Sequence, residues 1–194
     1  MFARSVVIAA LACAVSACGS GTAAQVTTTT KPPSYETLVG AGIALLKQNN
    51  LNAAQQLFEQ AVKVAPTLPV AYYDLGVINQ SESNTRGALQ EYLMADREDP
   101  KYVPALYNRA VIYRTTNKPL AVFLYRQVIQ LQPHSPTAYL ALGLMQIGGR
   151  GPSIKAQALG YLKQAVKLDR SLMADIPKKY RAEVRSTKTK SKTK

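Results

Sequence analysis

Apolar, small and turn-forming residues recur along this chain at intervals of 33 or 34 positions. Each copy carries an alanine, then a large apolar residue, then a second small or apolar residue, and finally a proline. Three copies are complete and a fourth ends in arginine: Ala54, Phe58, Ala61 and Pro66; Ala88, Tyr92, Ala95 and Pro100; Ala121, Tyr125, Val128 and Pro133; Ala158, Leu162, Ala165 and Arg170. Because proline cannot continue a helix, each complete copy predicts a helix that ends before its proline. Repeats of this length predict a stacked array with one continuous core and a long concave face, an architecture suited to holding partners.

A second set of landmarks, large apolar residues beside a small one, precedes each of these predicted helices. The set comprises Leu38, Ala41, Gly42 and Leu45; Tyr72, Leu75 and Gly76; Leu106, Ala110 and Tyr113; Tyr139, Leu142 and Gly143. Together the two sets resemble the tetratricopeptide repeat family, in which each repeat is a pair of antiparallel helices. The resemblance covers about two thirds of the chain, from Ser34 to Arg170. It implies an all-α fold, a right-handed α–α superhelix of about four helix-turn-helix repeats.

One small residue in each first helix is expected where the second helix comes close. These residues are Gly42, Gly76, Ala110 and Gly143. Glycine costs a helix about 1 kcal/mol relative to alanine, so tight packing is the expected compensation. The first alanine of each complete copy is expected to supply the opposing small surface, at Ala54, Ala88 and Ala121. The aromatic residues that follow these alanines are then expected to fill the larger gap between repeats.

The amino-terminal segment predicts export and lipid attachment. Arg4 precedes an apolar run at residues 6–15, which is too short for a comfortable membrane span and is typical of a signal peptide. The run ends in Val15-Ser16-Ala17-Cys18, which resembles the bacterial lipobox. That resemblance implies cleavage before the cysteine and transfer of a diacylglyceryl group to its sulfur. We therefore expect residues 1–17 to be a lipoprotein signal peptide and Cys18 to be the lipid attachment site.

Two alternatives for this segment stay open. Cys13 is a competing lipid acceptor, although alanine rather than an aliphatic residue stands three positions before it. An ordinary signal peptide cleaved after Ala17 would leave a free cysteine, which is a reactive liability on a secreted protein. In either case residues 18–33, with few large apolar side chains and a run of threonines, predict a flexible tether.

The formal net charge is +13, and more than half of it lies at the carboxyl terminus. Residues 178–194 contain eight basic residues and one acid. We expect a capping helix within 171–185 to close the last repeat, so that the repeat domain spans 34–185 and a disordered basic tail spans 186–194. On an exported protein this tail either binds anionic lipid or a cell-wall polymer, or only aids solubility. No nucleic-acid fold signature accompanies the charge, so no nucleic-acid partner is expected.

In the family that the chain resembles, partner peptides lie against the first helices on the concave face. Carrying that register over predicts a partner groove lined by Val39, Ile43, Tyr73, Val77, Tyr107, Asn108, Val111, Leu140 and Leu144. One subgroup of the family clamps a terminal carboxylate with Lys, Arg and Asn, whereas this chain has only Asn108 and Arg114 as matches in kind. We therefore expect an apolar groove for a helix or an extended peptide, anchored by Tyr73 and Tyr107. The opposing interpretation is that neighbouring repeats bury several of these residues.

Little in the sequence indicates catalysis. His134 is the only histidine, and it lies between prolines in a predicted turn. With one histidine and no cysteine after Cys18, a Cys/His zinc cluster cannot be built. The glycine-rich segment 148–153 lacks both the ending and the preceding strand of a phosphate-binding loop. We expect no enzymatic activity, no catalytic residue, no cofactor and no metal.

These observations predict a membrane-anchored tetratricopeptide repeat adaptor or scaffold of the bacterial cell envelope, outside the cytoplasm. It would mediate protein–protein interactions within an assembly or secretion complex. The alternative is an envelope structural protein whose basic tail binds anionic lipid or cell-wall polymer.

Overall fold

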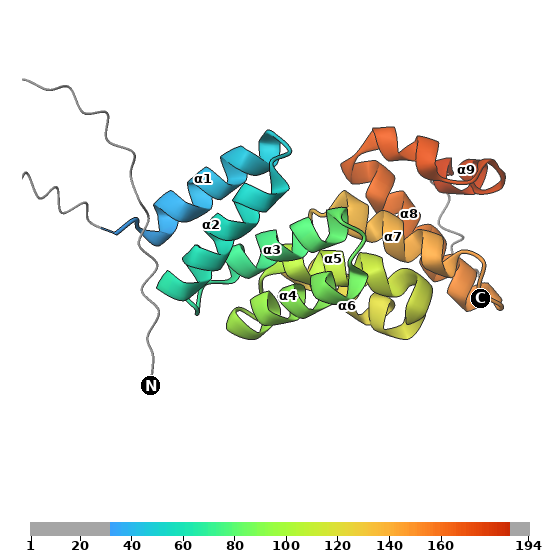
Figure 1. Cartoon of the computed structure of the whole chain (residues 1–194). Coiled ribbons are helices and arrows are strands. Elements are labelled where there is room, and N and C mark those ends of the chain that lie inside the picture. The colour runs from blue at the N-terminus through green and yellow to red at the C-terminus, as the bar shows by residue number, and fades with distance from the viewer. Residues whose placement is uncertain (1–31, 187–194) are drawn as a thin grey trace, which may run out of the picture. The chain divides into compact units, whose positions relative to one another are not determined.

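A computed structural model describes residues 32–186 of the chain (Figure 1). In this range the chain forms nine α-helices and one 3-10 helix, with no β-strand. The helices are α1 (Tyr35–Lys47), α2 (Leu51–Val64), α3 (Pro69–Ser81), α4 (Thr85–Glu98), α5 (Val103–Thr116), α6 (Lys118–Leu131), α7 (Pro136–Gln146), α8 (Pro152–Leu168), the 3-10 helix η1 (Arg170–Asp175) and α9 (Lys178–Arg185). None of them is both long enough and apolar enough to cross a bilayer.

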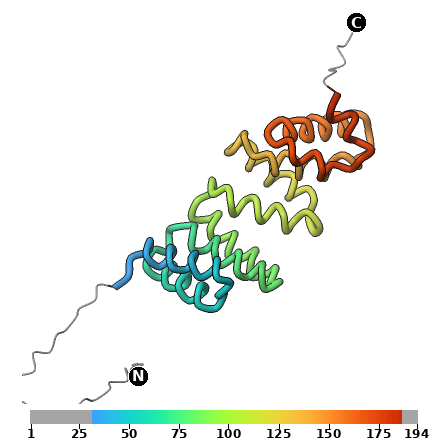
Figure 2. The backbone as a smooth tube through the Cα atoms, turned by 90° about the horizontal axis from the view of Figure 1, so that it is seen from above, coloured from blue at the N-terminus to red at the C-terminus, as the bar shows by residue number. Residues whose placement is uncertain are grey.

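The helices pack in four consecutive pairs, α1 with α2, α3 with α4, α5 with α6, and α7 with α8. Each pair contacts the next through its second helix and the first helix of its neighbour, so the described helices form a row from α1 to α9 (Figure 2). Buried apolar residues run through all four pairs as a sequence of adjoining clusters. The prediction of an all-α superhelix of four helical hairpins is therefore confirmed.

The helices begin either with a side-chain cap or with a proline in the first turn, and α6 has both. Asn50, Asn84 and Asn117 precede α2, α4 and α6, and each side-chain oxygen accepts a hydrogen bond from a backbone N–H of the first turn. Such a cap satisfies one of the donors that the first turn leaves without a helical partner. A proline stands in the first two positions of α3, α5 and α7, and also of α6 and α8, where the missing N–H costs no helical hydrogen bond. The repeat prolines Pro66 and Pro100 lie in the turns between pairs, as predicted.

Three glycines of the first helices lie close to a large ring or side chain of their own partner helix, and Gly143 also lies close to the backbone of Ala158. A Cβ added at Gly42 would lie 2.7 Å from Cε1 of Phe58. A Cβ at Gly76 would lie 2.5 Å from Cε1 of Tyr92. These positions are notches that admit the ring within one hairpin, because the ring needs more room than an alanine does. Phe58 and Tyr92 are fully buried, and each shares a core cluster with an alanine of the next hairpin, Ala71 and Ala105, so the rings also reach the space between repeats as predicted.

The third and fourth pairs differ in the length of their internal turn. Asn117 both ends α5 and caps α6, so this turn contains no additional residue. The turn between α7 and α8 is longer and contains Gly151, whose backbone φ of 108° lies in the left-handed region that favours glycine. This insertion carries no feature of a phosphate-binding loop, since the segment before it is helical.

The predicted single capping helix is instead two short helices, η1 and α9, separated by Pro177. Proline has no backbone N–H and restricts the residue before it, so one continuous helix cannot pass this point. Ile176 and Val184 are nevertheless buried against Ala158 and Leu162 of α8, and so the two helices cover the open side of the last hairpin. An ion pair of 3.0 Å between Lys155 Nζ and Glu183 Oε1 joins α8 to α9.

Several predictions fall outside the described residues. These are the signal peptide at 1–17, the lipid attachment at Cys18, nearly all of the tether, and the basic tail after Ser186.

Candidate partner groove

Three cavities follow the first helices of the second, third and fourth hairpins, and we call this row the groove. The cavity between α3 and α5 has a volume of about 360 Å³. The next, between α5 and the start of α7, has about 220 Å³, and the third, between α5 and α7, has about 300 Å³. Tyr73 and Asn108 line both of the first two cavities, which therefore adjoin each other. A row of adjacent recesses is suited to successive side chains of a bound segment.

The predicted anchor Tyr73 is on α3 and lies at the centre of an aromatic cluster. Its ring centroid is 5.7 Å from that of Tyr92 and 5.7 Å from that of Tyr102, in tilted and edge-on arrangements. Such geometries are favourable for aromatic pairs. Tyr73 is half-buried and lines two cavities, so one side of its ring faces the groove while the other packs inside.

A hydrogen-bonded network of four side chains forms the polar part of the groove. Asn108 Nδ2 donates to the Tyr92 hydroxyl at 3.1 Å and to the Tyr73 hydroxyl at 3.5 Å. The Tyr92 hydroxyl in turn donates to Gln80 Oε1 at 2.9 Å. Burial raises the pKa of Tyr92 to about 12, an effect that the hydrogen bond from Asn108 partly opposes. Both tyrosines therefore stay protonated at physiological pH, and the network holds Asn108 in one orientation.

The second predicted anchor, Tyr107, also lines the groove. Its ring lies edge-on to Tyr125 of α6 with the centroids 5.6 Å apart, and it borders the 220 Å³ cavity. Val77 lines the first cavity, and Leu144 lines the third together with Arg114. The structure thus brings five of the nine predicted groove residues to cavities along neighbouring first helices.

The other four predicted groove residues belong mainly to the core. Val39 is buried in a core cluster of α1, α2 and α3, and it lines none of the three cavities. Ile43, Val111 and Leu140 are half-buried and pack against core clusters of their own hairpins. Sequence reasoning also missed Gln80 and Gln132, which line cavities and carry no apolar signal.

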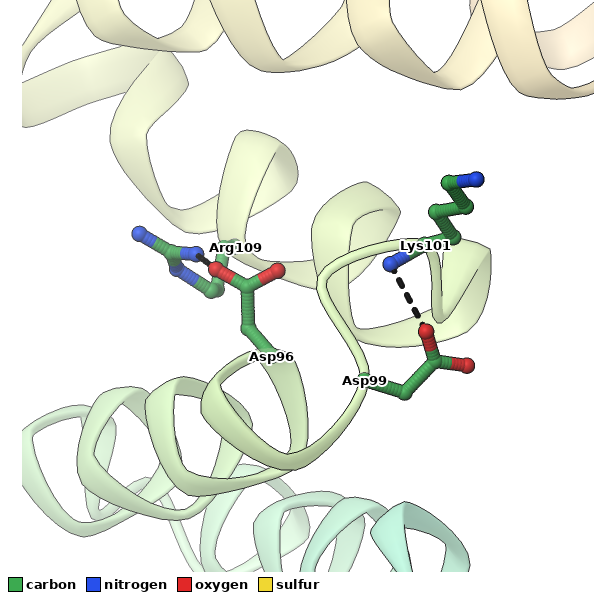
Figure 3. Close-up of polar contacts among 4 residues, drawn as sticks. All are labelled: Asp96, Asp99, Lys101 and Arg109. Atoms are coloured by element: carbon green, nitrogen blue, oxygen red, sulfur yellow. Dashed lines mark hydrogen bonds and ion pairs between the residues drawn. The ribbon is translucent and has the colours of Figure 1, made fainter.

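Two aspartates near the end of α4, Asp96 and Asp99, have structural roles at the junction with α5 (Figure 3). Asp96 pairs with the guanidinium of Arg109, which is 10% exposed, and the pair joins the second hairpin to the third. Asp99 Oδ1 accepts a hydrogen bond of 2.9 Å from the backbone N–H of Lys101 and so closes the turn. Within residues 32–186 no group of three or more His, Cys, Asp or Glu side chains lies close enough to hold a metal ion.

Comparison with known proteins identifies these hairpins. Residues 39–103 match a family model described as a tetratricopeptide repeat. The hairpins have the tetratricopeptide repeat fold. The match covers α1 to the start of α5, and the α5–α6 and α7–α8 hairpins extend the same packing beyond it. The tetratricopeptide repeat fold generally supports binding of protein or peptide partners, so a scaffold built for protein–protein interaction follows from the fold.

Curated relatives share only the repeats. The chain is 34% identical over 79 residues to a probable UDP-N-acetylglucosamine–peptide N-acetylglucosaminyltransferase SPINDLY from Solanum lycopersicum, a match that covers 41% of this chain and 8% of that protein. The corresponding protein from Hordeum vulgare is 28% identical over 118 residues, which cover 57% of this chain and 12% of the relative. The chain thus spans about a tenth of the length of these relatives. The transferase activity in their names is a property of those proteins.

Solved structures agree with the fold over most of the chain. The crystal structure of MamA superposes with a TM-score of 0.61 at 24% identity, covering 75% of this chain and 84% of MamA. A structure of pilF from Pseudomonas aeruginosa gives a TM-score of 0.62 at 22% identity, covering 72% of this chain and 63% of that one. A thermophilic tetratricopeptide repeat protein from Thermus thermophilus gives 0.57 at 20% identity, covering 77% and 83%. At these identities the likeness concerns the fold alone.

Proposed function

We propose that this tetratricopeptide repeat protein is a lipid-anchored adaptor of a bacterial envelope complex, which holds a peptide segment of another protein in its groove. The observation that carries the proposal is the row of cavities along α3, α5 and α7, the first two of which share Tyr73 and Asn108. In this proposal the chain binds and positions partners, and it carries out no reaction itself.

The groove favours a partner segment with apolar side chains at regular intervals and a free polar backbone group between them. The half-buried rings of Tyr73 and Tyr107 offer apolar area at a low cost in conformational entropy, as anchoring residues of interfaces do. The amide of Asn108 is already oriented by two tyrosine hydroxyls, so it is preorganised for a hydrogen bond to the bound segment.

Site-specific photocrosslinking in intact cells tests the groove. A photoreactive phenylalanine analogue at Tyr107 is expected to capture a protein partner. The matched control is the same analogue at Phe123, an aromatic residue on α6 that is 57% exposed and lines no groove cavity. Equal crosslinked products from both positions, or none from Tyr107 in cells that express the chain stably, would count against a groove partner.

The anchor is proposed from the sequence Val15-Ser16-Ala17-Cys18. Mass spectrometry of the mature chain is expected to find a diacylglyceryl group on an amino-terminal Cys18, and Cys18→Ser is expected to release the chain from membranes. An unmodified amino terminus would remove the anchor from the proposal and leave the groove unaffected.

A second candidate function is favoured by the four lysines that follow Ser186. In it the tail grips an anionic envelope surface and the repeats act as a spacer. Deleting residues 187–194 in a Cys18→Ser background separates the candidates, since a loss of envelope retention on deletion supports the tail and unchanged retention rejects it.

A further inference from the structure

A cavity separate from the groove lies at the carboxyl end of the row, where α8 meets η1 and α9. Its volume of about 770 Å³ is about twice that of the widest groove cavity. Its lining combines four cations with three apolar side chains and a serine: Lys163, Lys167, Arg170, Arg185, Val166, Met173, Val184 and Ser186. The size lies within the range of cavities that bind ligands in proteins.

The apolar residues form the floor of this cavity and the cations form its rim. Val184 is only 6% exposed, and Val166 and Met173 are half-buried. In contrast, Lys167, Arg170 and Arg185 are exposed. A ligand that fills the cavity therefore meets positive charge at the opening and apolar surface below it.

No ion pair within the described part of the chain neutralises the rim charges. Across residues 32–186 the ion pairs are Arg109 with Asp96 and Lys155 with Glu183, and neither includes a rim cation. The nearby carboxylate of Asp169 is occupied by hydrogen bonds from the backbone and side chain of Ser171. Residues 163–186 contain seven basic and three acidic side chains. Like charges one helical turn apart repel each other, so a bound anion would relieve this repulsion.

We propose that this cavity binds an acidic peptide segment that also carries apolar side chains. Carboxylates of the segment pair with the rim cations, and its apolar side chains fill the space above Met173 and Val184. A bilayer is the poorer fit, because the apolar surface lies in a recess beneath the cations and a flat headgroup layer cannot reach it. The cavity uses other helices than the groove, so this proposal stands or falls independently of the groove partner.

Fluorescence anisotropy with the full-length chain tests the proposal. The probe is a fluorescein-labelled octapeptide that alternates glutamate and leucine, with a lysine–leucine octapeptide as the charge control. The acidic probe is expected to bind and the basic probe is not. Lys167→Glu combined with Arg170→Glu is expected to weaken binding at least about tenfold, because it reverses two rim charges. The matched variant, Lys47→Glu with Lys63→Glu, makes the same charge change on exposed residues far along the row and is expected to bind normally.

Each remaining outcome has a defined meaning. A chain that ends at Ser186 is expected to bind the acidic probe as the full-length chain does, and loss of binding in it would assign the effect to the tail and overturn the proposal. Equal weakening by both charge-reversal pairs would indicate a general field effect and would also overturn it. Failure of the acidic probe to bind, together with binding of phosphatidylglycerol vesicles that the rim variant abolishes, would assign the rim to lipid. Thermal melts by circular dichroism establish that the variants are folded.

Discussion

Replacing Asp74 with Asn is expected to stabilise the chain at neutral pH and to leave its stability in acid almost unchanged. Asp74 lies on α3 and is 8% exposed, and among residues 32–186 its Oδ2 has no hydrogen-bond partner. Burial raises the pKa of this carboxyl from its ordinary 3.8 to about 6. Within residues 32–186 neither ion pair includes this carboxylate. The rings near it belong to Tyr35, Tyr73 and Tyr102, whose pKa values are raised by burial and then also by the charge of Asp74.

The magnitude follows from the two pKa values. A tenfold change in proton affinity corresponds to about 1.4 kcal/mol, so the difference between 3.8 and about 6 corresponds to about 3 kcal/mol. Because the folded-state pKa is the higher one, the folded chain binds more protons than the unfolded chain between these values. The contribution to stability is therefore fully present below pH 3.8 and is lost as the pH rises through about 6. Asparagine keeps the shape and cannot ionise, so the variant lacks this loss.

Urea unfolding followed by circular dichroism, at intervals from about pH 4 to pH 8, measures the effect. The quantity to compare is the difference in unfolding free energy between Asp74→Asn and the unmodified chain at each pH. The pKa of Glu91 is also raised by burial, but this residue is present in both chains and its contribution cancels. The difference is expected to grow from a few tenths of a kcal/mol near pH 4 to about 3 kcal/mol at pH 8. A difference that does not vary with pH would show that Asp74 is solvated or paired in solution and would refute the argument.

Five further substitutions, in three tests, probe the packing. Gly42→Ala is expected to destabilise the chain by about 1–3 kcal/mol, because the added methyl overpacks the contact with Phe58. Gly40→Ala on the same helix meets nothing within 4 Å and is expected to stabilise the chain by about 1 kcal/mol. Equal urea midpoints for the two variants would contradict the close contact at Gly42. Tyr92→Phe removes a hydroxyl with two hydrogen-bond partners and should cost about 1–2 kcal/mol, while Tyr125→Phe removes a buried hydroxyl without a partner among the described residues and should be near neutral. Asp96→Ala leaves its buried arginine partner uncompensated and should cost about 3 kcal/mol, and an unchanged thermal midpoint would mean that water replaces the carboxylate.

The repeat period was sufficient to predict the hairpins because the same packing of two antiparallel helices recurs four times along the chain. It did not reveal which side chain fills each notch, since Ala54 and Phe58 lie one turn apart on α2 and only the crossing geometry decides between them. Tyr73 and Tyr107 could be placed at the groove because their register repeats, whereas Val39 has the same register and is buried in the core, a difference that the register does not reveal.

The basic cavity could not be predicted from spacing alone. Lys163 and Lys167 are one turn apart on α8, and this pair was visible in the sequence. Arg185, however, reaches the same opening only because the chain turns back at Pro177 and α9 returns to α8. Such a site depends on how two short helices fold over the last hairpin, and no periodic signal describes that path.

The pairing of each notch with a ring or large side chain of its own hairpin also bears on how the chain acquires its structure. The partners are 16 residues apart at Gly42 and Phe58, 16 at Gly76 and Tyr92, and 19 at Gly143 and Leu162. Contacts of such short sequence separation close small loops, and proteins rich in them fold quickly. A hairpin can thus complete its own contacts as soon as about 30 residues are available. The chain can therefore fold progressively from its amino-terminal hairpin onward, without waiting for its carboxyl terminus.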